Sequence, residues 1–120
     1  MNDKIREIIK ESVAVKTRVL EDPKLIGLVD RIVTLIVERF REGKHLYFCG
    51  NGGSAADVAD FTTEYTCRFI NDRHPYPAIN LTADGSLLTA TGNDYGYEEI
   101  FARQVCAFRS EEHTSELQSQ

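Results

Sequence analysis

The sequence predicts an α/β fold built on a parallel sheet, with two amphipathic helices in front of it. Three observations support this prediction. A strand runs into a glycine-rich bend and a helix over residues 45–57, a second strand-to-helix turn follows at residues 78–86, and helical apolar spacing precedes both. Helix, strand, helix and strand in this order are typical of a doubly wound sheet with crossover helices.

Composition predicts one domain of a cytoplasmic protein. The 120 residues carry a formal net charge of −5, and 42% of them are hydrophobic. Lys and Arg are scattered and outnumbered by Asp and Glu, which argues against a nucleic-acid surface. No apolar run approaches the roughly 18 residues of a membrane span, and we see no signal peptide. The three cysteines follow no metal-ligand spacing and are expected to be reduced.

Helical spacing of apolar residues in the first part of the chain predicts a pair of helices over residues 3–42. Asp22 and Pro23 provide an N-cap followed by proline at the first helical position, and Gly43 provides the C-terminal stop. The apolar stripe of the second helix is wider than one sheet face needs, because it includes three additional residues, Ile26, Val33 and Val37. This width favours packing against another subunit, and coverage by the first helix is the alternative.

The stretch Phe48–Asp57 has the pattern of a phosphate-binding turn between a strand and a helix. Its glycines let the backbone approach an anion, and we expect Ser54 to cap the helix, whose first N–H groups carry the positive end of the helix dipole. No Lys follows the glycines, so a Walker-type nucleotide site is excluded. The glycines formally match a dinucleotide fingerprint, but the acid after the next strand, Asp84, comes later than that fingerprint requires. A tight turn without a ligand is a further alternative.

The helix after this turn, expected over residues 54–68, carries an acidic stripe. Asp57, Asp60 and Glu64 project from nearly one face, and we expect them near the mouth of the phosphate site. In one interpretation Glu64 pairs with Arg68 as ordinary solvated surface. In another, Glu64 is a general acid or base, or Asp60 and Glu64 together ligate a divalent metal.

The second strand, expected over residues 78–82, leads to a turn at the carboxyl edge of the sheet, which is the ligand side. A short helix over residues 87–90 is expected next, followed by a polar loop over residues 91–97. Amide and carboxylate groups in this loop, including Asn93 and Asp94, can hydrogen-bond sugar hydroxyls. Loops of such composition are, however, mostly connectors.

Together these motifs resemble the sugar isomerase (SIS) domain of phosphoheptose isomerases. The residues that carry the resemblance occur in the expected order within residues 1–107: Cys49–Ser54, the helix through Glu64, Leu81–Asp84 and Thr89–Gln104. The resemblance implies a three-layer αβα sandwich with a parallel sheet, SIS or flavodoxin-like, preceded by two helices. It also implies a cytoplasmic homotetramer that holds zinc and converts sedoheptulose 7-phosphate to a heptose 7-phosphate.

The resemblance also assigns residues to roles. The substrate-binding residues it implies are Asn51, Gly52, Gly53, Ser54, Glu64, Asn93 and Asp94. Glu64 is then the acid or base of an aldose–ketose proton transfer through an enediol, and Asp60 and Glu64 are metal ligands. Many of these isomerases have a zinc-binding histidine where this chain has Asp60, and a carboxylate favours harder metals than imidazole does.

By the same resemblance, residues 1–108 are the amino-terminal part of an SIS domain, with the helical pair at 3–42 and the sheet part at 44–108. The family continues with further strands, a Ser-Thr-Ser-Gly phosphate loop and a carboxyl-terminal helix, so the fragment is expected to be inactive alone. Residues 109–120 resemble the translation of a sequencing adapter and are expected to be a non-native or disordered tail. The alternative function is a non-catalytic SIS module that binds a phosphosugar or a protein partner.

Overall fold

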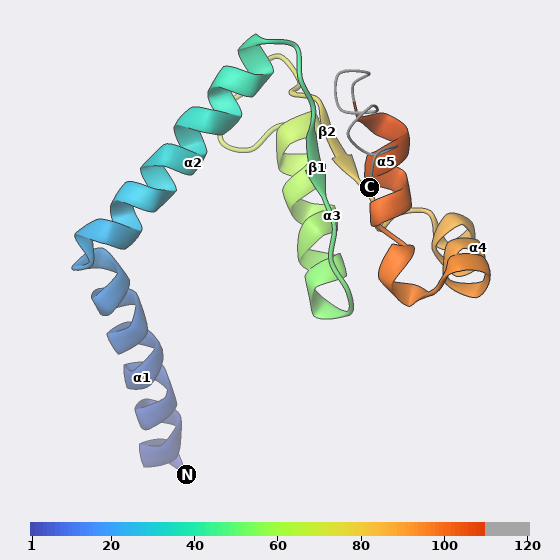
Figure 1. The fold of residues 1–120 in the computed structure, drawn as a ribbon. Helices are drawn as coiled ribbons and strands as arrows, with labels where there is room; N and C mark the ends of the chain where they lie inside the picture. The colour runs from blue at the N-terminus through green and yellow to red at the C-terminus, as the bar shows by residue number, and fades with distance from the viewer. Residues whose placement is uncertain (110–120) are drawn as a thin grey trace. The chain divides into compact units, whose positions relative to one another are not determined.

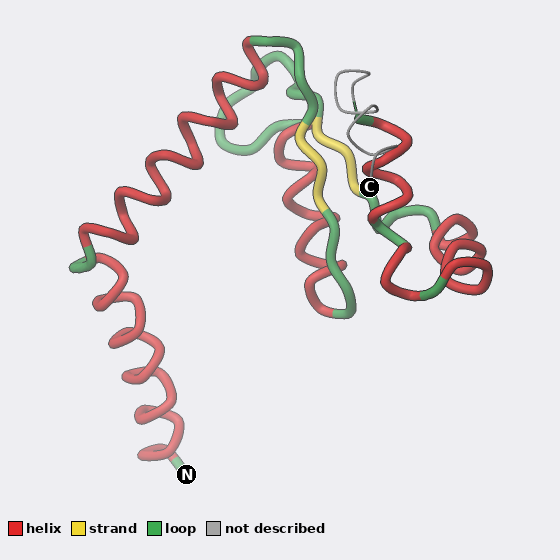
Figure 2. Tube along the Cα trace, viewed as in Figure 1, coloured by secondary structure: helices red, strands yellow, loops and turns green. Residues whose placement is uncertain are grey.

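The computed structural model describes residues 1–109, which fall into two compact units that divide after Gly43 (Figure 1). The expected tail at 109–120 lies outside the described residues except for Arg109. Figure 2 shows that the first unit is helical and that both strands belong to the second. Among the described residues, no helix is both long and apolar enough to cross a membrane.

The first unit consists of two helices, α1 (Asn2–Leu20) and α2 (Pro23–Arg41). Asp22 caps α2 as predicted, because its carboxylate accepts hydrogen bonds from the N–H groups of Lys24 at 3.0 Å and Leu25 at 3.1 Å. These are two of the first-turn donors that have no partner inside a helix. The sequence therefore fixes the start of α2 locally.

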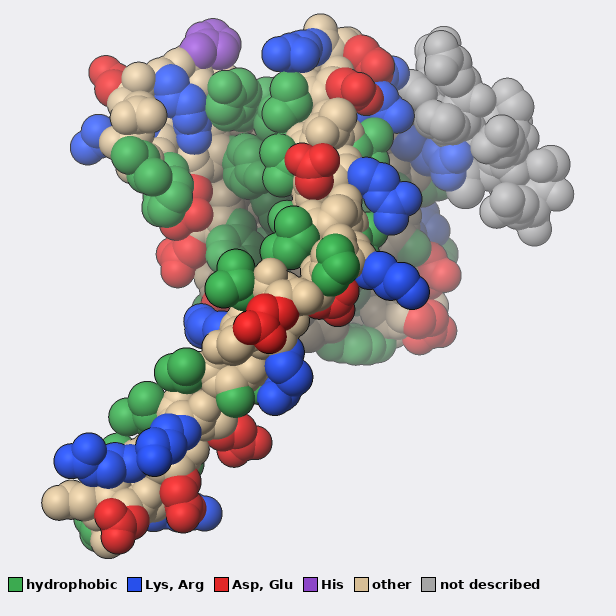
Figure 3. All heavy atoms as spheres, turned by 90° about the vertical axis from the view of Figure 1, so that its left-hand side faces the viewer, with side chains coloured by type: hydrophobic (Ala, Val, Ile, Leu, Met, Phe, Trp, Pro, Cys, Tyr) green, Lys and Arg blue, Asp and Glu red, His purple; other side chains and the backbone are tan. Residues whose placement is uncertain are grey.

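Neither helix of the first unit has a buried residue. Seven apolar side chains of α2 are between 40% and 53% exposed: Ile26, Leu28, Val29, Ile32, Val33, Leu35 and Val37. Figure 3 shows that apolar side chains are uncovered on one face of the molecule. Coverage of α2 by α1, the alternative within one chain, therefore does not occur in the described residues.

The second unit contains a two-stranded parallel sheet and the helices around it. Its elements, in chain order, are β1 (Leu46–Phe48), α3 (Gly53–Thr66), β2 (Ala78–Asn80), α4 (Gly85–Tyr95), the 3-10 helix η1 (Tyr97–Glu99) and α5 (Ala102–Phe108). β1 pairs with β2 so that Leu46 lies opposite Ala78 and Phe48 opposite Asn80. Helix α3 connects the two strands and packs against β2, as a parallel pair requires (Figure 1). The predicted α/β class with a parallel sheet is confirmed.

The core of this unit is small and is built from β2, α3 and the residues that directly follow β2 and η1. Its buried apolar residues in the described range are Val58, Ala78, Leu81 and Ile100. The buried amide of Gln104 donates hydrogen bonds to the carbonyls of Leu81 at 2.8 Å and Ile100 at 2.9 Å. Gln104 thus holds the end of β2 against the segment before α5.

Two local predictions in this unit are wrong. The N-cap of α3 is Gly52, without a side-chain hydrogen bond, so Ser54 lies inside the helix and does not cap it. Most of the expected loop at 91–97 is helical, because α4 continues to Tyr95. Asp84 starts α4 by accepting a hydrogen bond from the N–H of Leu87 at 3.2 Å, and the helix then buries Thr91.

Candidate active site

The bend between β1 and α3 is a tight turn held by its own backbone. The N–H of Ser54 donates to the carbonyl of Asn51 at 3.0 Å, and the N–H of Ala55 donates to the carbonyl of Gly52 at 3.1 Å. Gly52 has φ of +56° and ψ of −124°, a conformation that side chains rarely adopt. The turn therefore needs glycine at this position.

Gly50 is required for a different reason, which is a close approach between the bend and α3. A Cβ atom on Gly50 would lie 2.8 Å from the Cβ of Ser54 and 2.9 Å from the carbonyl carbon and oxygen of the same residue. Two of these three atoms belong to the backbone of the first helical turn. Only glycine lets β1 run this close to the start of α3.

Three consecutive backbone donors at the bend have no acceptor within the described part of the chain. They are the N–H groups of Asn51, Gly52 and Gly53, all on exposed residues. The next two N–H groups, of Ser54 and Ala55, are used inside the turn. Free N–H groups in succession at the positive end of a helix dipole form a concave site for an anion. We call residues 50–54 the cradle.

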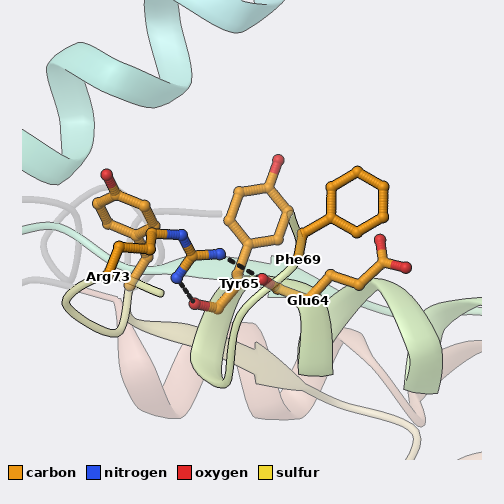
Figure 4. A pocket seen from close by; sticks show the side chains of 5 residues that line it. Glu64, Tyr65, Phe69 and Arg73 are labelled. Carbon is orange, nitrogen blue, oxygen red and sulfur yellow. Dashed lines mark hydrogen bonds between the residues drawn. The ribbon is translucent and has the colours of Figure 1, made fainter. Parts of the chain in front are cut away.

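Glu64 lies near the other end of α3 and lines a pocket of about 210 Å³ with four residues, Tyr65, Phe69, Arg73 and Tyr76. The Arg73 guanidinium donates hydrogen bonds to the backbone carbonyls of Glu64 and Tyr65, the latter at 2.9 Å. It also lies over the ring of Tyr76, 4.6 Å from its centroid. Arg73 therefore caps the last carbonyls of α3, while Figure 4 shows the Glu64 carboxylate pointing away from the guanidinium.

The interpretation in which Glu64 pairs with Arg68 is wrong. The ion pairs within residues 1–109 are Lys4–Glu7 and Arg39–Glu42, both in the first unit. The i, i+4 argument fails because α3 ends at Thr66, so Arg68 is no longer on the helix.

Glu64 is also farther from the cradle than predicted. It follows Gly53 by eleven residues, which at 1.5 Å per residue is about 16 Å, or three helical turns. Sharing a face with Asp57 does not bring it to the mouth of the cradle. The expectation that the acidic stripe lies near that mouth is therefore wrong for Glu64.

The two other groups of predicted site residues lie on the surface. Asn93 and Asp94 are exposed near the end of α4, and the Asn93 amide donates to the Asp94 carboxylate at 3.1 Å. Neither side chain has a hydrogen bond to the cradle or to Glu64 within the described residues. The structure thus leaves their role in substrate binding a prediction.

The described residues do not fit a complete metal site. Asp60 is exposed and Glu64 half-buried on the same helix, and nowhere in residues 1–109 do three or more His, Cys, Asp or Glu side chains gather closely enough to hold a metal ion. Zinc in proteins usually has four ligands, at least three of them from the protein. Asp60 and Glu64 supply at most two.

Two residues at the site were given no role from the sequence. The hydroxyl of Thr82 exchanges hydrogen bonds with the backbone of Gly50, and Arg73 caps α3 beside Glu64. An arginine seven residues after the end of α3 gives no local signal. The Thr82 contact joins residues 32 positions apart, so it depends on the register between β1 and β2.

Comparison with known proteins identifies the family. The SIS domain family model matches residues 7–113. The phosphoheptose isomerase of Aneurinibacillus thermoaerophilus is 44% identical over 107 residues, covering 89% of this chain and 54% of that protein. The phosphoheptose isomerase of Roseiflexus sp. (strain RS-1) is 50% identical over 99 residues, covering 81% and 48% respectively.

The likeness extends to three dimensions. The structure of the phosphoheptose isomerase of Neisseria gonorrhoeae matches with a TM-score of 0.79 at 32% identity, covering 89% of this chain and 54% of that one. The chain spans about half the length of the relatives it matches. Its parallel strands, the crossover α3 and the glycine bend between them agree with this match, and the chain belongs to the SIS domain family.

Proposed function

We propose that this protein isomerises sedoheptulose 7-phosphate to a heptose 7-phosphate. The observation that carries the proposal is the cradle, whose three free N–H groups at Asn51, Gly52 and Gly53 suit a phosphate. The substrate is proposed from the relatives, which are named phosphoheptose isomerases. Because the chain spans about half of their length, the proposal concerns the part of the active site that these residues carry.

The cradle holds the phosphate at one end of the sugar and so orients the reacting carbons at the other. Ser54 adds a hydroxyl beside the cradle, and Asn93 and Asp94 bind sugar hydroxyls. Glu64 takes a proton from the carbon next to the ketone carbonyl, and protonation of the carbonyl oxygen gives an enediol. Return of the proton to the former carbonyl carbon, together with loss of the hydroxyl proton at the neighbouring carbon, completes the aldose, so no oxidant or reductant is consumed.

The remaining features of the proposal rest on the surface of the first unit and on the relatives. The exposed apolar stripe of α2 supports a homo-oligomer, proposed as a tetramer, in which another copy covers it. The cytoplasmic location also remains a proposal. Asp60 and Glu64 are proposed to bind a divalent metal only with further ligands, so no step of the mechanism uses one.

A specific observation favours a second function, that of a non-catalytic phosphosugar-binding module. Glu64 lies about 16 Å along α3 from Gly53, so the cradle and Glu64 of one chain are separated. A binding module needs the cradle alone. It does not need Glu64 beside the bound sugar.

Turnover of sedoheptulose 7-phosphate by the complete protein, with Glu64→Gln as the variant, distinguishes the two functions. If the protein is an isomerase, Glu64→Gln loses turnover and still binds the phosphosugar in calorimetry, because the amide keeps the shape of the carboxylate but cannot accept the proton. Asp72→Asn, an exposed carboxylate after α3, is the matched control and should keep normal turnover. Parental turnover in Glu64→Gln would rule out the mechanism, and binding without turnover in the parent would favour the module.

A further inference from the structure

The parallel ladder between β1 and β2 ends at the cradle. At the two ends of the ladder, the N–H of Leu46 donates to the carbonyl of Pro77 at 2.9 Å, and the N–H of Leu81 donates to the carbonyl of Phe48 at 2.8 Å. In this register, alternate residues of the first strand donate their N–H across the ladder. Each of these N–H groups bonds the carbonyl of the residue that precedes its Cα partner on the second strand. Continued by one more step, the ladder would join the N–H of Gly50 to the carbonyl of Leu81.

That hydrogen bond is replaced by two side chains. The carbonyl of Leu81 accepts from the buried amide of Gln104 at 2.8 Å. The N–H of Gly50 instead donates to the hydroxyl of Thr82 at 3.1 Å, and the same hydroxyl donates back to the carbonyl of Gly50 at 3.2 Å. One side chain therefore satisfies both backbone groups of the first cradle glycine.

Thr82 is itself held in place. Its N–H donates to the side-chain carbonyl of Asn80 at 2.8 Å, and the residue is half-buried. Asn80 is the last residue of β2, paired with Phe48. The position of the hydroxyl is thus tied to the sheet rather than to the bend.

We propose that Thr82 is a positioning residue that fixes the cradle for phosphate binding. Gly50 can approach α3 closely only if its N–H and its carbonyl have hydrogen-bond partners in the orientation that this approach requires. The Thr82 hydroxyl is the partner of both groups. Fixing Gly50 also fixes the direction of the next three N–H groups, at residues 51–53. The ligand named here, a sugar phosphate, rests on the proposed function, whereas the effect on the cradle backbone does not.

The experiment compares three variants of the complete protein. Thr82→Val removes the hydroxyl and keeps the shape, and Thr82→Ser keeps the hydroxyl. Thr66→Val is the matched control, because the Thr66 hydroxyl also bonds a distant carbonyl, that of Ala78 at 3.1 Å, but at the other end of α3. Hydrogen exchange of the peptide covering residues 49–56 measures the cradle, and KM and kcat for sedoheptulose 7-phosphate measure its use.

We expect Thr82→Val to speed exchange of the hydrogen-bonded amides at the bend, those of Gly50, Ser54 and Ala55, about fivefold. It should also raise KM about five- to tenfold with a smaller change in kcat, the scale of one lost hydrogen bond. Thr82→Ser and Thr66→Val should exchange like the parent at the cradle. Parental exchange and KM in Thr82→Val, or loosening of the cradle in Thr82→Ser, would overturn the proposal. If Thr82→Val does not fold, Thr82→Ala takes its place with the same expectations.

The two proposals fail in different ways. A parent protein without turnover or phosphosugar binding would remove the proposed function, and the exchange measurement would still decide the role of Thr82. If the parent protein turns over the sugar phosphate and Thr82→Val exchanges at the cradle like the parent, only the role of Thr82 is ruled out.

Discussion

Replacement of Gly50 by alanine tests the close approach on which the cradle depends. The new methyl group would meet the Cβ of Ser54 at 2.8 Å and the backbone carbonyl carbon and oxygen of Ser54 at 2.9 Å. Backbone atoms in the first turn of α3 cannot move aside without disturbing the bonds from Ser54 and Ala55 to the bend. We expect Gly50→Ala to lower the free energy of unfolding by about 1–3 kcal/mol, the usual cost of overpacking.

Urea unfolding of the complete protein measures this cost, and calorimetry with the sugar phosphate measures the accompanying loss of binding. Gly53→Ala is the matched control, since a Cβ at this position has no atom within 4 Å. As the first residue of α3, it should be neutral or stabilising by less than about 1 kcal/mol. Equal unfolding free energies for Gly50→Ala and the parent would refute the argument from close approach.

Two further predictions concern the core and the exposed surface. Gln104→Leu should cost about 1–3 kcal/mol in thermal unfolding, because the carbonyls of Leu81 and Ile100 lose their buried donor; a parental melting temperature would contradict this. The 120-residue chain expressed alone should associate or aggregate in size-exclusion chromatography, because α2 leaves seven apolar side chains uncovered. This chain alone should also not isomerise sugar phosphates. A soluble, active monomer would contradict the second prediction.

The sequence predicted those features whose cause is local. Asp22 followed by Pro23 determines where α2 begins, and the structure shows the cap. The apolar run before the glycines and the second run near residue 78 predicted two parallel strands, which pair as β1 and β2. Each of these signals lies within a few residues of the structure it specifies.

The features that the sequence did not predict depend on backbone conformation or on distant residues. Ser54 is a favourable N-cap residue, but the N-cap of α3 is Gly52, two residues earlier, at a positive φ. The composition of residues 91–97 favours a loop, and the burial of Thr91 together with the Asp84 cap makes most of it helix. The contact of Thr82 with Gly50 requires the register of the sheet, which no local spacing reveals.

The separation of Glu64 from the cradle has a consequence for catalysis. An extended seven-carbon sugar phosphate is about 10 Å long, since its bonds are near 1.5 Å. The phosphate would lie beyond the start of α3, and Glu64 lies about 16 Å from Gly53 along the helix. The Glu64 side chain reaches back only about 4 Å, so it cannot touch the reacting carbons of a sugar held by its own cradle.

If Glu64 is the base, it must therefore act on a sugar held by the cradle of another copy. This can be tested with two inactive variants, Gly52→Val, which strains the bend at φ of +56° and obstructs the phosphate, and Glu64→Gln. When the two are unfolded together and reassembled in equal amounts, about a quarter of the sites combine an intact cradle with an intact Glu64 from a different copy. Recovery of about a quarter of parental turnover is the expected result, with each variant reassembled alone as the control. If both oligomers assemble and the mixture stays inactive, the cradle and Glu64 do not act on one substrate from different copies, and the assignment of Glu64 as the base fails.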